Sequence, residues 1–108
     1  MSFTVFLTAD ASRDLGEIYQ YIAHHDAPEK AGQVLSKIER TVKNLSKYPE
    51  RGVCPKELLS LGIRDYREVF FKPYRLIYRV MNGRVYVLLI ADGRRDMQTL
   101  LQRRLLED

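Results

Sequence analysis

Apolar and polar residues alternate most clearly around the dipeptide Asn82-Gly83, between residues 66 and 96. Both central positions of a type I′ turn need residues that tolerate positive φ, so this dipeptide predicts a two-residue β-hairpin loop. Loop length sets the register of a hairpin. We therefore expect four cross-strand pairs: Met81 with Arg84, Val80 with Val85, Tyr78 with Val87 and Leu76 with Leu89.

The predicted pairing divides the hairpin into two unlike faces. One face is apolar throughout and consists of Leu76, Tyr78, Val80, Val85, Val87 and Leu89. The other face mixes arginine with apolar groups and consists of Arg75, Ile77, Arg79, Tyr86, Leu88 and Ile90. We expect this mixed face to bind an anionic or amphipathic partner. Alternatively, its arginines form surface ion pairs with a carboxylate such as Glu68 on the preceding strand.

The chain before the hairpin predicts a strand and two amphipathic helices. Residues 3–7 are largely β-branched or aromatic, as in a strand. Thr8 or Asp10 then caps a helix with apolar residues at helical spacing. Asp26 and Pro28 mark the start of a second helix. Two helices joined so closely form an αα-hairpin.

Three further segments complete the predicted fold. Residues 49–61 lack a period and read as a loop, whose leucines we expect to fold back on the core: Leu58, Leu59 and Leu61. Residues 65–71 form the strand before the hairpin, and if Phe71 faces Tyr74, Glu68 shares the arginine-bearing face. Asp96 caps a final helix with an apolar stripe made of Met97, Leu100, Leu101 and Leu105.

The element order is thus β-α-α-β-β-β-α, which predicts an α+β domain with a largely antiparallel β-sheet backed by an αα-hairpin. A chain of 108 residues, 45% of them apolar, fits one domain over residues 1–108. No stretch suits a signal peptide or a membrane span, so we expect a cytoplasmic protein without a membrane partner. Cys54 is the single cysteine, and we expect neither a disulfide, nor a metal, nor a cofactor.

The net charge of +4 is concentrated in the second half of the chain. Residues 61–108 hold ten Lys or Arg against six Asp or Glu, whereas residues 1–60 hold eight of each. Nearly all cations of the second half are arginines, which suit bidentate contacts to phosphate or carboxylate. This half could meet a nucleic acid or an acidic protein, and composition does not choose between them.

Several segments resemble toxins of the RelE/ParE superfamily of bacterial type II toxin-antitoxin modules. They are PYRLIYRV at 73–80, NGRVYVLLI at 82–90 and ADGRRDMQTLLQRRL at 91–105. The segment LTADASRDLGEIYQYIAHHDAPEKA at 7–31 is similar to the ParE branch in particular. The resemblance covers nearly the whole chain. It implies a toxin that a cognate antitoxin, ParD-like or other, holds inactive.

The resemblance also bears on the target. RelE-type members cleave messenger RNA on the ribosome, and Arg75 and Arg95 match two of their catalytic arginines. The basic pair expected on the preceding strand, however, falls near Tyr66 and Glu68, and the expected tyrosine falls on Leu101. A glutamate repels phosphate, and leucine cannot transfer a proton. The resemblance therefore favours the ParE activity, inhibition of DNA gyrase without catalysis, over the alternative of a ribosome-dependent mRNA interferase. A non-toxic nucleic-acid-binding module is a third hypothesis.

We expect the target or the antitoxin to contact a set of arginines and apolar residues: Arg75, Arg79, Tyr86, Leu88, Ile90, Arg94 and Arg95. Ile77 would extend the apolar part of this strip, open to water in the free toxin. Gly93 and Asp96 would hold the arginine pair between them at the open edge of the sheet. Alternatively, Arg95 ties down the C-terminus by bonding to Asp92 or to carbonyls.

Overall fold

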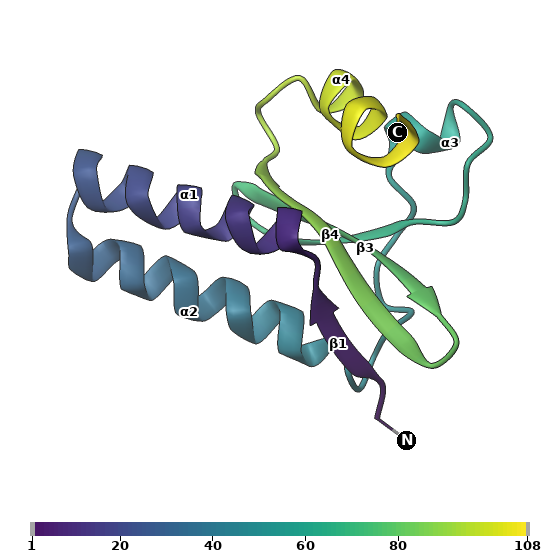
Figure 1. Ribbon diagram of the computed structural model, residues 1–108, viewed down its shortest axis with the longest axis horizontal. Helices are drawn as coiled ribbons and strands as arrows, with labels where there is room; N and C mark the ends of the chain where they lie inside the picture. Colours follow the sequence, from purple (N-terminus) through teal and green to yellow (C-terminus); the bar gives the residue numbers. More distant parts are fainter. Residues whose placement is uncertain (1, 108) are drawn as a thin grey trace.

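The computed structural model describes residues 2–107 as a four-stranded sheet with helices on both faces (Figure 1). The strands are β1 (Thr4–Leu7), β2 (Arg67–Phe71), β3 (Tyr74–Met81) and β4 (Arg84–Asp92), in the spatial order β1-β4-β3-β2. The helices α1 (Ala9–His25) and α2 (Pro28–Asn44) form the predicted αα-hairpin on one face. The short helices α3 (Lys56–Leu59) and α4 (Met97–Leu101) and the π-helical turn η1 (Gln102–Leu106) cover part of the other face. The predicted α+β class is confirmed.

The sheet is antiparallel except at one strand. The strands β2, β3 and β4 pair antiparallel in sequence order, and Phe71 lies opposite Tyr74 as expected. β1 pairs with β4 in parallel, Thr4 opposite Arg84, because the helical hairpin carries the chain back before the meander begins. β1 ends at Leu7, so the second half of β4 extends beyond it as a free edge.

The hairpin turn and the first half of its register match the sequence prediction. Asn82 and Gly83 have φ angles of 52° and 75°, so both occupy the left-handed region that the turn requires. The pairing then slips by one residue, because Leu88 has no partner on β3. Beyond this β-bulge Leu76 lies opposite Ile90, not opposite Leu89 as predicted.

The bulge exchanges the two faces of β4. Val85 and Val87 pack against the helical hairpin, and after the bulge Ile90 takes that position. Leu89 and Ala91 turn instead to the face beneath α3 and α4, where they join Ile77. The predicted assignment of Leu89 to the hairpin face and of Ile90 to the arginine-bearing face is therefore wrong.

The helix starts follow local capping chemistry. The Thr8 hydroxyl accepts a hydrogen bond from the Ala11 amide at 3.1 Å, and the Asp96 carboxylate accepts one from Thr99 at 3.2 Å, as predicted. α2 differs, because its cap position is Ala27, without a side-chain bond, and Asp26 pairs with Lys30 instead. Within residues 2–107, no helix combines the length and apolar character needed to cross a bilayer.

The segment predicted as a loop contains α3, which places a second small core on the sheet. Leu58 is fully buried among Ile77, Leu89 and Leu101, whereas Leu59 and Leu61 stay exposed, contrary to expectation. This second core covers Ile77 completely. The face opposite the helical hairpin thus stays accessible toward the Asn82-Gly83 end of the sheet and at Phe70 on β2.

Candidate functional site

Arg75 is almost completely buried, and two glutamates enclose its guanidinium group. Its Nε donates to Glu68 Oε1 at 2.7 Å, and Nη1 and Nη2 donate to the two carboxylate oxygens of Glu57 at 2.8 Å each. Glu68 and Arg75 are 5% and 8% exposed. The predicted Glu68–Arg75 pair is confirmed, but its predicted exposure at the surface is wrong. The cluster ties α3 to the sheet and carries one positive charge against two negative ones.

The ionisation of this cluster follows from its contacts. The hydrogen bonds that Arg75 donates to Glu57 are the main reason that the pKa of Arg75 is raised, and the same contact lowers the pKa of Glu57. Burial raises the pKa of Glu68, and the Arg75 bond opposes this only in part. The two carboxylates that bind Arg75 therefore differ, because the pKa of Glu57 is lowered and the pKa of Glu68 is raised.

Gly93 supports the cluster through close packing. A Cβ atom at this position would lie 2.9 Å from Arg75 Cδ and 3.1 Å from Cγ. The Gly93 amide also donates to the carbonyl of Pro73 at 2.8 Å. The glycine is thus required for the close approach of the Arg75 stem.

The open end of the same sheet face carries an aromatic–arginine patch. This patch consists of Phe6, Tyr66, Arg79, Met81, Tyr86 and Leu88, around a hollow of about 240 Å³ lined also by Arg104 and Leu105. The Phe6 and Tyr86 rings stack with centroids 5.4 Å apart. The guanidinium carbon of Arg79 lies 5.6 Å from the centre of the Tyr66 ring, and Arg79 approaches Asp65 at 3.4 Å. Such an exposed pair holds Arg79 only weakly.

Arg94 and Arg95 are exposed and lie beside a groove between α1 and the end of β4. This α1–β4 groove has a volume of about 350 Å³, and its walls include Ile18, Tyr21, Ile22, Tyr74, Ile90 and Asp92. Arg94, not Arg95 as the alternative supposed, bonds to Asp92, with Nε 2.9 Å from Oδ1. The Arg95 side chain forms no hydrogen bond or ion pair with residues 2–107. Ile90, although only 1% exposed, contributes to the wall of this groove.

An ion pair joins α1 to the C-terminal turn beside the aromatic–arginine patch. Arg104 donates to both carboxylate oxygens of Asp14 at 3.0 Å and to the carbonyl of Leu88 at 3.1 Å. Asp14 also accepts the amide hydrogen of Ile90 at 3.0 Å. The pair thus satisfies backbone groups at the bulge, on the part of β4 that β1 does not cover.

The structure therefore divides the predicted site residues among three places. Arg75 belongs to the buried glutamate cluster; Arg79, Tyr86 and Leu88 to the aromatic–arginine patch; Ile90, Arg94 and Arg95 to the α1–β4 groove. The expected continuous apolar strip does not exist, because Ile77 and Ile90 are buried. Sequence reasoning missed Glu57, Asp14 and Arg104. Each lies between one basic residue and one leucine in the sequence, so no local pattern singles it out.

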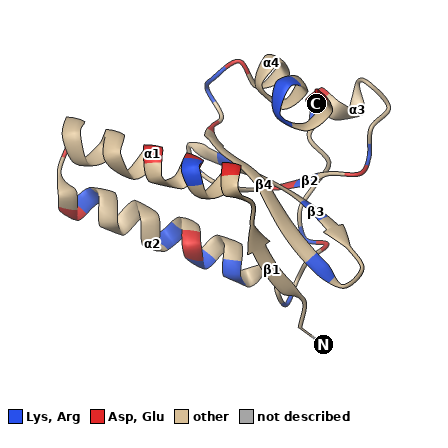
Figure 2. Ribbon diagram, viewed as in Figure 1, with Lys and Arg blue, Asp and Glu red and all other residues tan. Residues whose placement is uncertain are grey.

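Within residues 2–107, no group of three or more His, Cys, Asp or Glu side chains is arranged to hold a metal ion. The candidate sites are instead built around arginine side chains. Figure 2 shows that basic residues recur along α2, at the Asn82-Gly83 end of β4 and between β4 and α4. These groups can bind carboxylates or phosphates through charge-assisted hydrogen bonds.

Comparison with known proteins agrees with this architecture. The chain is 28% identical over 97 residues to toxin ParE3 of Caulobacter vibrioides, which covers 90% of this chain and 93% of that toxin. The fold resembles a chain of the chromosomal ParDE toxin-antitoxin system from P. aeruginosa, with a TM-score of 0.71 and 22% identity over 84% of this chain and 96% of that chain. It also resembles a chain of the toxin-antitoxin complex RelBE2 from Mycobacterium tuberculosis, with a TM-score of 0.63 and 22% identity over 85% and 99% of the two chains. The profile of the ParE toxin of the type II toxin-antitoxin system parDE matches residues 5–97. The chain therefore belongs to the ParE toxin family.

Proposed function

We propose that this toxin inhibits DNA gyrase by binding it, without cleaving a nucleic acid itself, and that a cognate antitoxin neutralises it by direct contact. The observation that carries the choice of target is the enclosure of Arg75 by Glu57 and Glu68. The resemblance to mRNA interferases assigned a catalytic role to this arginine and to Arg95. Whether the Arg75 guanidinium group is free to contact phosphate therefore bears directly on the choice between gyrase inhibition and mRNA cleavage.

RNA cleavage needs a guanidinium group free to meet the charged phosphate, and groups that donate and accept protons. In this toxin Arg75 directs Nε, Nη1 and Nη2 at carboxylates, and the cluster has an excess of negative charge that repels phosphate. Leu101, at the position where the resemblance expects a tyrosine, is fully buried and cannot transfer a proton. These contacts favour inhibition by binding over ribosome-dependent cleavage of mRNA.

The accessible surfaces have the composition of protein-binding sites. Tyrosine, phenylalanine, methionine and arginine are enriched where proteins bind one another, and these residue types make up most of the aromatic–arginine patch. The stacked Phe6 and Tyr86 rings present a preorganised apolar surface beside Arg79. We assign this patch to gyrase, and Arg94 and Arg95 at the α1–β4 groove to the same contact or to the antitoxin. The origin of both solved relatives in toxin-antitoxin systems supports an antitoxin partner.

Two assays side by side test the proposal. Purified toxin is added to gyrase with relaxed plasmid, and separately to ribosomes translating a defined mRNA. We expect loss of supercoiling and intact mRNA. Replacement of both Arg79 and Tyr86 by alanine should relieve the inhibition, whereas Arg13→Ala, which removes an exposed arginine on α1, should not. Cleaved mRNA with unaffected supercoiling would instead establish the interferase alternative.

A further inference from the structure

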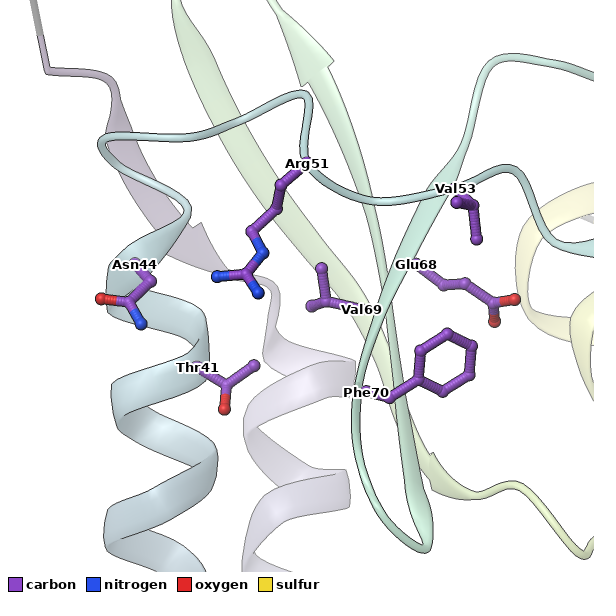
Figure 3. Close-up of a pocket in the computed structure, with 7 residues that line it drawn as sticks. All are labelled: Thr41, Asn44, Arg51, Val53, Glu68, Val69 and Phe70. Atoms are coloured by element: carbon purple, nitrogen blue, oxygen red, sulfur yellow. The ribbon is translucent and has the colours of Figure 1, made fainter.

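A third accessible surface, at the outer edge of the sheet, shares no residue with the aromatic–arginine patch or the α1–β4 groove. β2 is the last strand of the sheet, so one side of its backbone faces away from β3. A groove of about 320 Å³ follows this side, lined by Thr41 and Asn44 of α2, by Arg51 and Val53 of the following loop, and by Glu68, Val69 and Phe70 of β2. Figure 3 shows Arg51 reaching into the space between α2 and β2. We define these residues as the β2-edge groove.

The chain itself already pairs with this edge, but only at one residue. The Val53 amide donates to the Glu68 carbonyl at 3.1 Å, and the Glu68 amide donates to the Val53 carbonyl at 2.7 Å. The pairing stops there, because Arg51 turns away and its amide donates to Tyr48. In an antiparallel sheet, alternate residues direct both backbone groups to the same side. Since Glu68 directs its groups outward, Phe70 does so too, and no other strand of residues 2–107 pairs with it there.

The side chains around the unpaired backbone edge at Phe70 are polar on the side toward α2 and largely apolar on the other side. Toward α2 lie Arg51, Asn44 and Thr41, of which Arg51 and Asn44 form no side-chain hydrogen bond with residues 2–107. On the other side lie the half-exposed rings and methyl groups of Phe70 and Val53, with 51% and 58% exposure. Figure 3 shows the Phe70 ring and the Glu68 carboxylate on the side of β2 away from Arg51. The carboxylate is already bound to Arg75, so it does not neutralise the groove.

We propose that the β2-edge groove binds an extended, acidic segment of a partner protein as an additional strand of the sheet. The partner residue opposite Phe70 would exchange both backbone hydrogen bonds with it and place an apolar side chain against Phe70 and Val53. Its two neighbours would point toward α2, where acidic side chains meet Arg51 and Asn44. Lys37, one helical turn before Thr41 on α2, adds positive charge beyond the Phe70 end of the groove, where its Nζ lies 5.9 Å from the centre of the Phe71 ring.

This surface shares no residue with the aromatic–arginine patch that we assign to gyrase. Exposed edge strands are sites of unwanted association, and proteins protect them with charged residues or cover them. Here the protection is incomplete: Val53 covers Glu68, and the groups of Phe70 stay open. The occupant is identified by its chemistry, namely alternating acidic and aliphatic side chains on an extended backbone.

The test uses the full-length protein and a five-residue probe, acetyl-Glu-Val-Glu-Val-Glu-amide, followed through the amide signals of the ¹⁵N-labelled toxin. We expect shifts centred on Phe70 and slower hydrogen exchange of its amide. Arg51→Ala should weaken binding about 10-fold, as expected for loss of a charge-assisted hydrogen bond. Lys43→Ala is the matched control, since Lys43 lies on α2 but lines the opposite groove with Val5 and Leu15.

Two altered probes separate strand addition from simple charge attraction. A peptide with lysine in place of glutamate, and a peptide in which both valines are N-methylated and so cannot donate a backbone hydrogen bond to Phe70, should both bind much more weakly. Equal binding of either peptide would overturn the proposal. So would shifts that leave Phe70 unaffected. Tighter, Arg51-dependent binding of a twelve-nucleotide single-stranded DNA without protection of the Phe70 amide would identify a phosphate site instead and would also overturn it.

Discussion

Arg104 and Asp14, 90 positions apart in the sequence, form a bidentate ion pair that joins the C-terminal turn to the first helix. Their side chains are only 19% and 12% exposed, and both also bond to the backbone of β4. The pair therefore holds three segments together: α1, the bulged half of β4 and η1. Hydrogen bonding to Asp14 raises the pKa of Arg104, in agreement with this close contact.

We expect Arg104→Ala to lower the free energy of unfolding by about 2 kcal/mol, because it leaves the Asp14 carboxylate half-paired and largely buried. Urea unfolding measures this change. Arg13→Ala breaks the exposed pair of Arg13 with Asp10 and should change stability by less than about 1 kcal/mol. Equal effects of the two substitutions would show that the Arg104 contact is not structural.

The Arg75 cluster should contribute to stability more than its sequence suggests. Removal of one partner from a surface Glu68–Arg75 pair would barely change the free energy of unfolding, but here the pair is buried. We expect Arg75→Ala to cost about 3–5 kcal/mol, because it leaves two buried carboxylates without a counter-charge. Combining Arg75→Met with glutamine at Glu57 and Glu68 removes all three charges and should recover much of that loss. Thermal unfolding of the single and triple variants decides whether the charge is responsible.

Acid should lower the free energy of unfolding of the toxin, partly through Glu57. Arg75 lowers the pKa of Glu57 below its ordinary value of 4.5, so this contribution to stability is complete above pH 4.5 and is lost as the pH falls through the folded-state pKa. Burial raises the pKa of Glu68 above 4.5, so its ionisation opposes folding as the pH rises and has the opposite sign. Urea midpoints between about pH 3 and 6 should therefore fall less steeply with acid in Glu57→Gln than in the wild type. A steeper fall in Glu57→Gln would contradict the assignment.

Arg95 offers the cleanest separation of function from folding. Its side chain is exposed and unbonded within residues 2–107, whereas Arg94 is held by Asp92. Arg95→Ala should weaken growth inhibition several-fold while the melting temperature stays within about 2 °C of the wild type, as for surface substitutions in general. Arg103→Ala, another exposed arginine nearby in the sequence, is the control. Full toxicity of Arg95→Ala would remove Arg95 from the target surface.

Much of the fold could be predicted because local chemistry and global structure agree. The Asn82-Gly83 turn, the Thr8 and Asp96 caps and the apolar stripes of α1 and α2 each follow from a few neighbouring residues. The bulge at Leu88 could not be predicted, since residues 85–90 are apolar at both alternate phases and fit either face of the sheet. A uniformly apolar run has no preferred register until tertiary contacts supply one.

The site was harder to predict because its contacts join distant segments. Glu57 lies on a single helical turn that has too little periodicity to be recognised, yet it determines whether Arg75 is available. The pairing of Arg104 with Asp14 depends likewise on where the C-terminal turn crosses α1. Arginine content predicted a binding surface, and this surface stays a prediction. Carboxylates far away in the sequence determine which arginines remain free, and no spacing along the chain reveals these pairs.

The most direct test of the account is the supercoiling of relaxed plasmid by purified gyrase, titrated with the wild-type toxin and with Arg75→Met. If Arg75 acts only in the structure, Arg75→Met should inhibit gyrase as the wild type does, at the same concentration of correctly folded protein measured by circular dichroism. Prior addition of the cognate antitoxin should restore supercoiling in both cases. Undiminished supercoiling at toxin concentrations well above that of gyrase would contradict the central claim that this ParE-family toxin acts by binding gyrase.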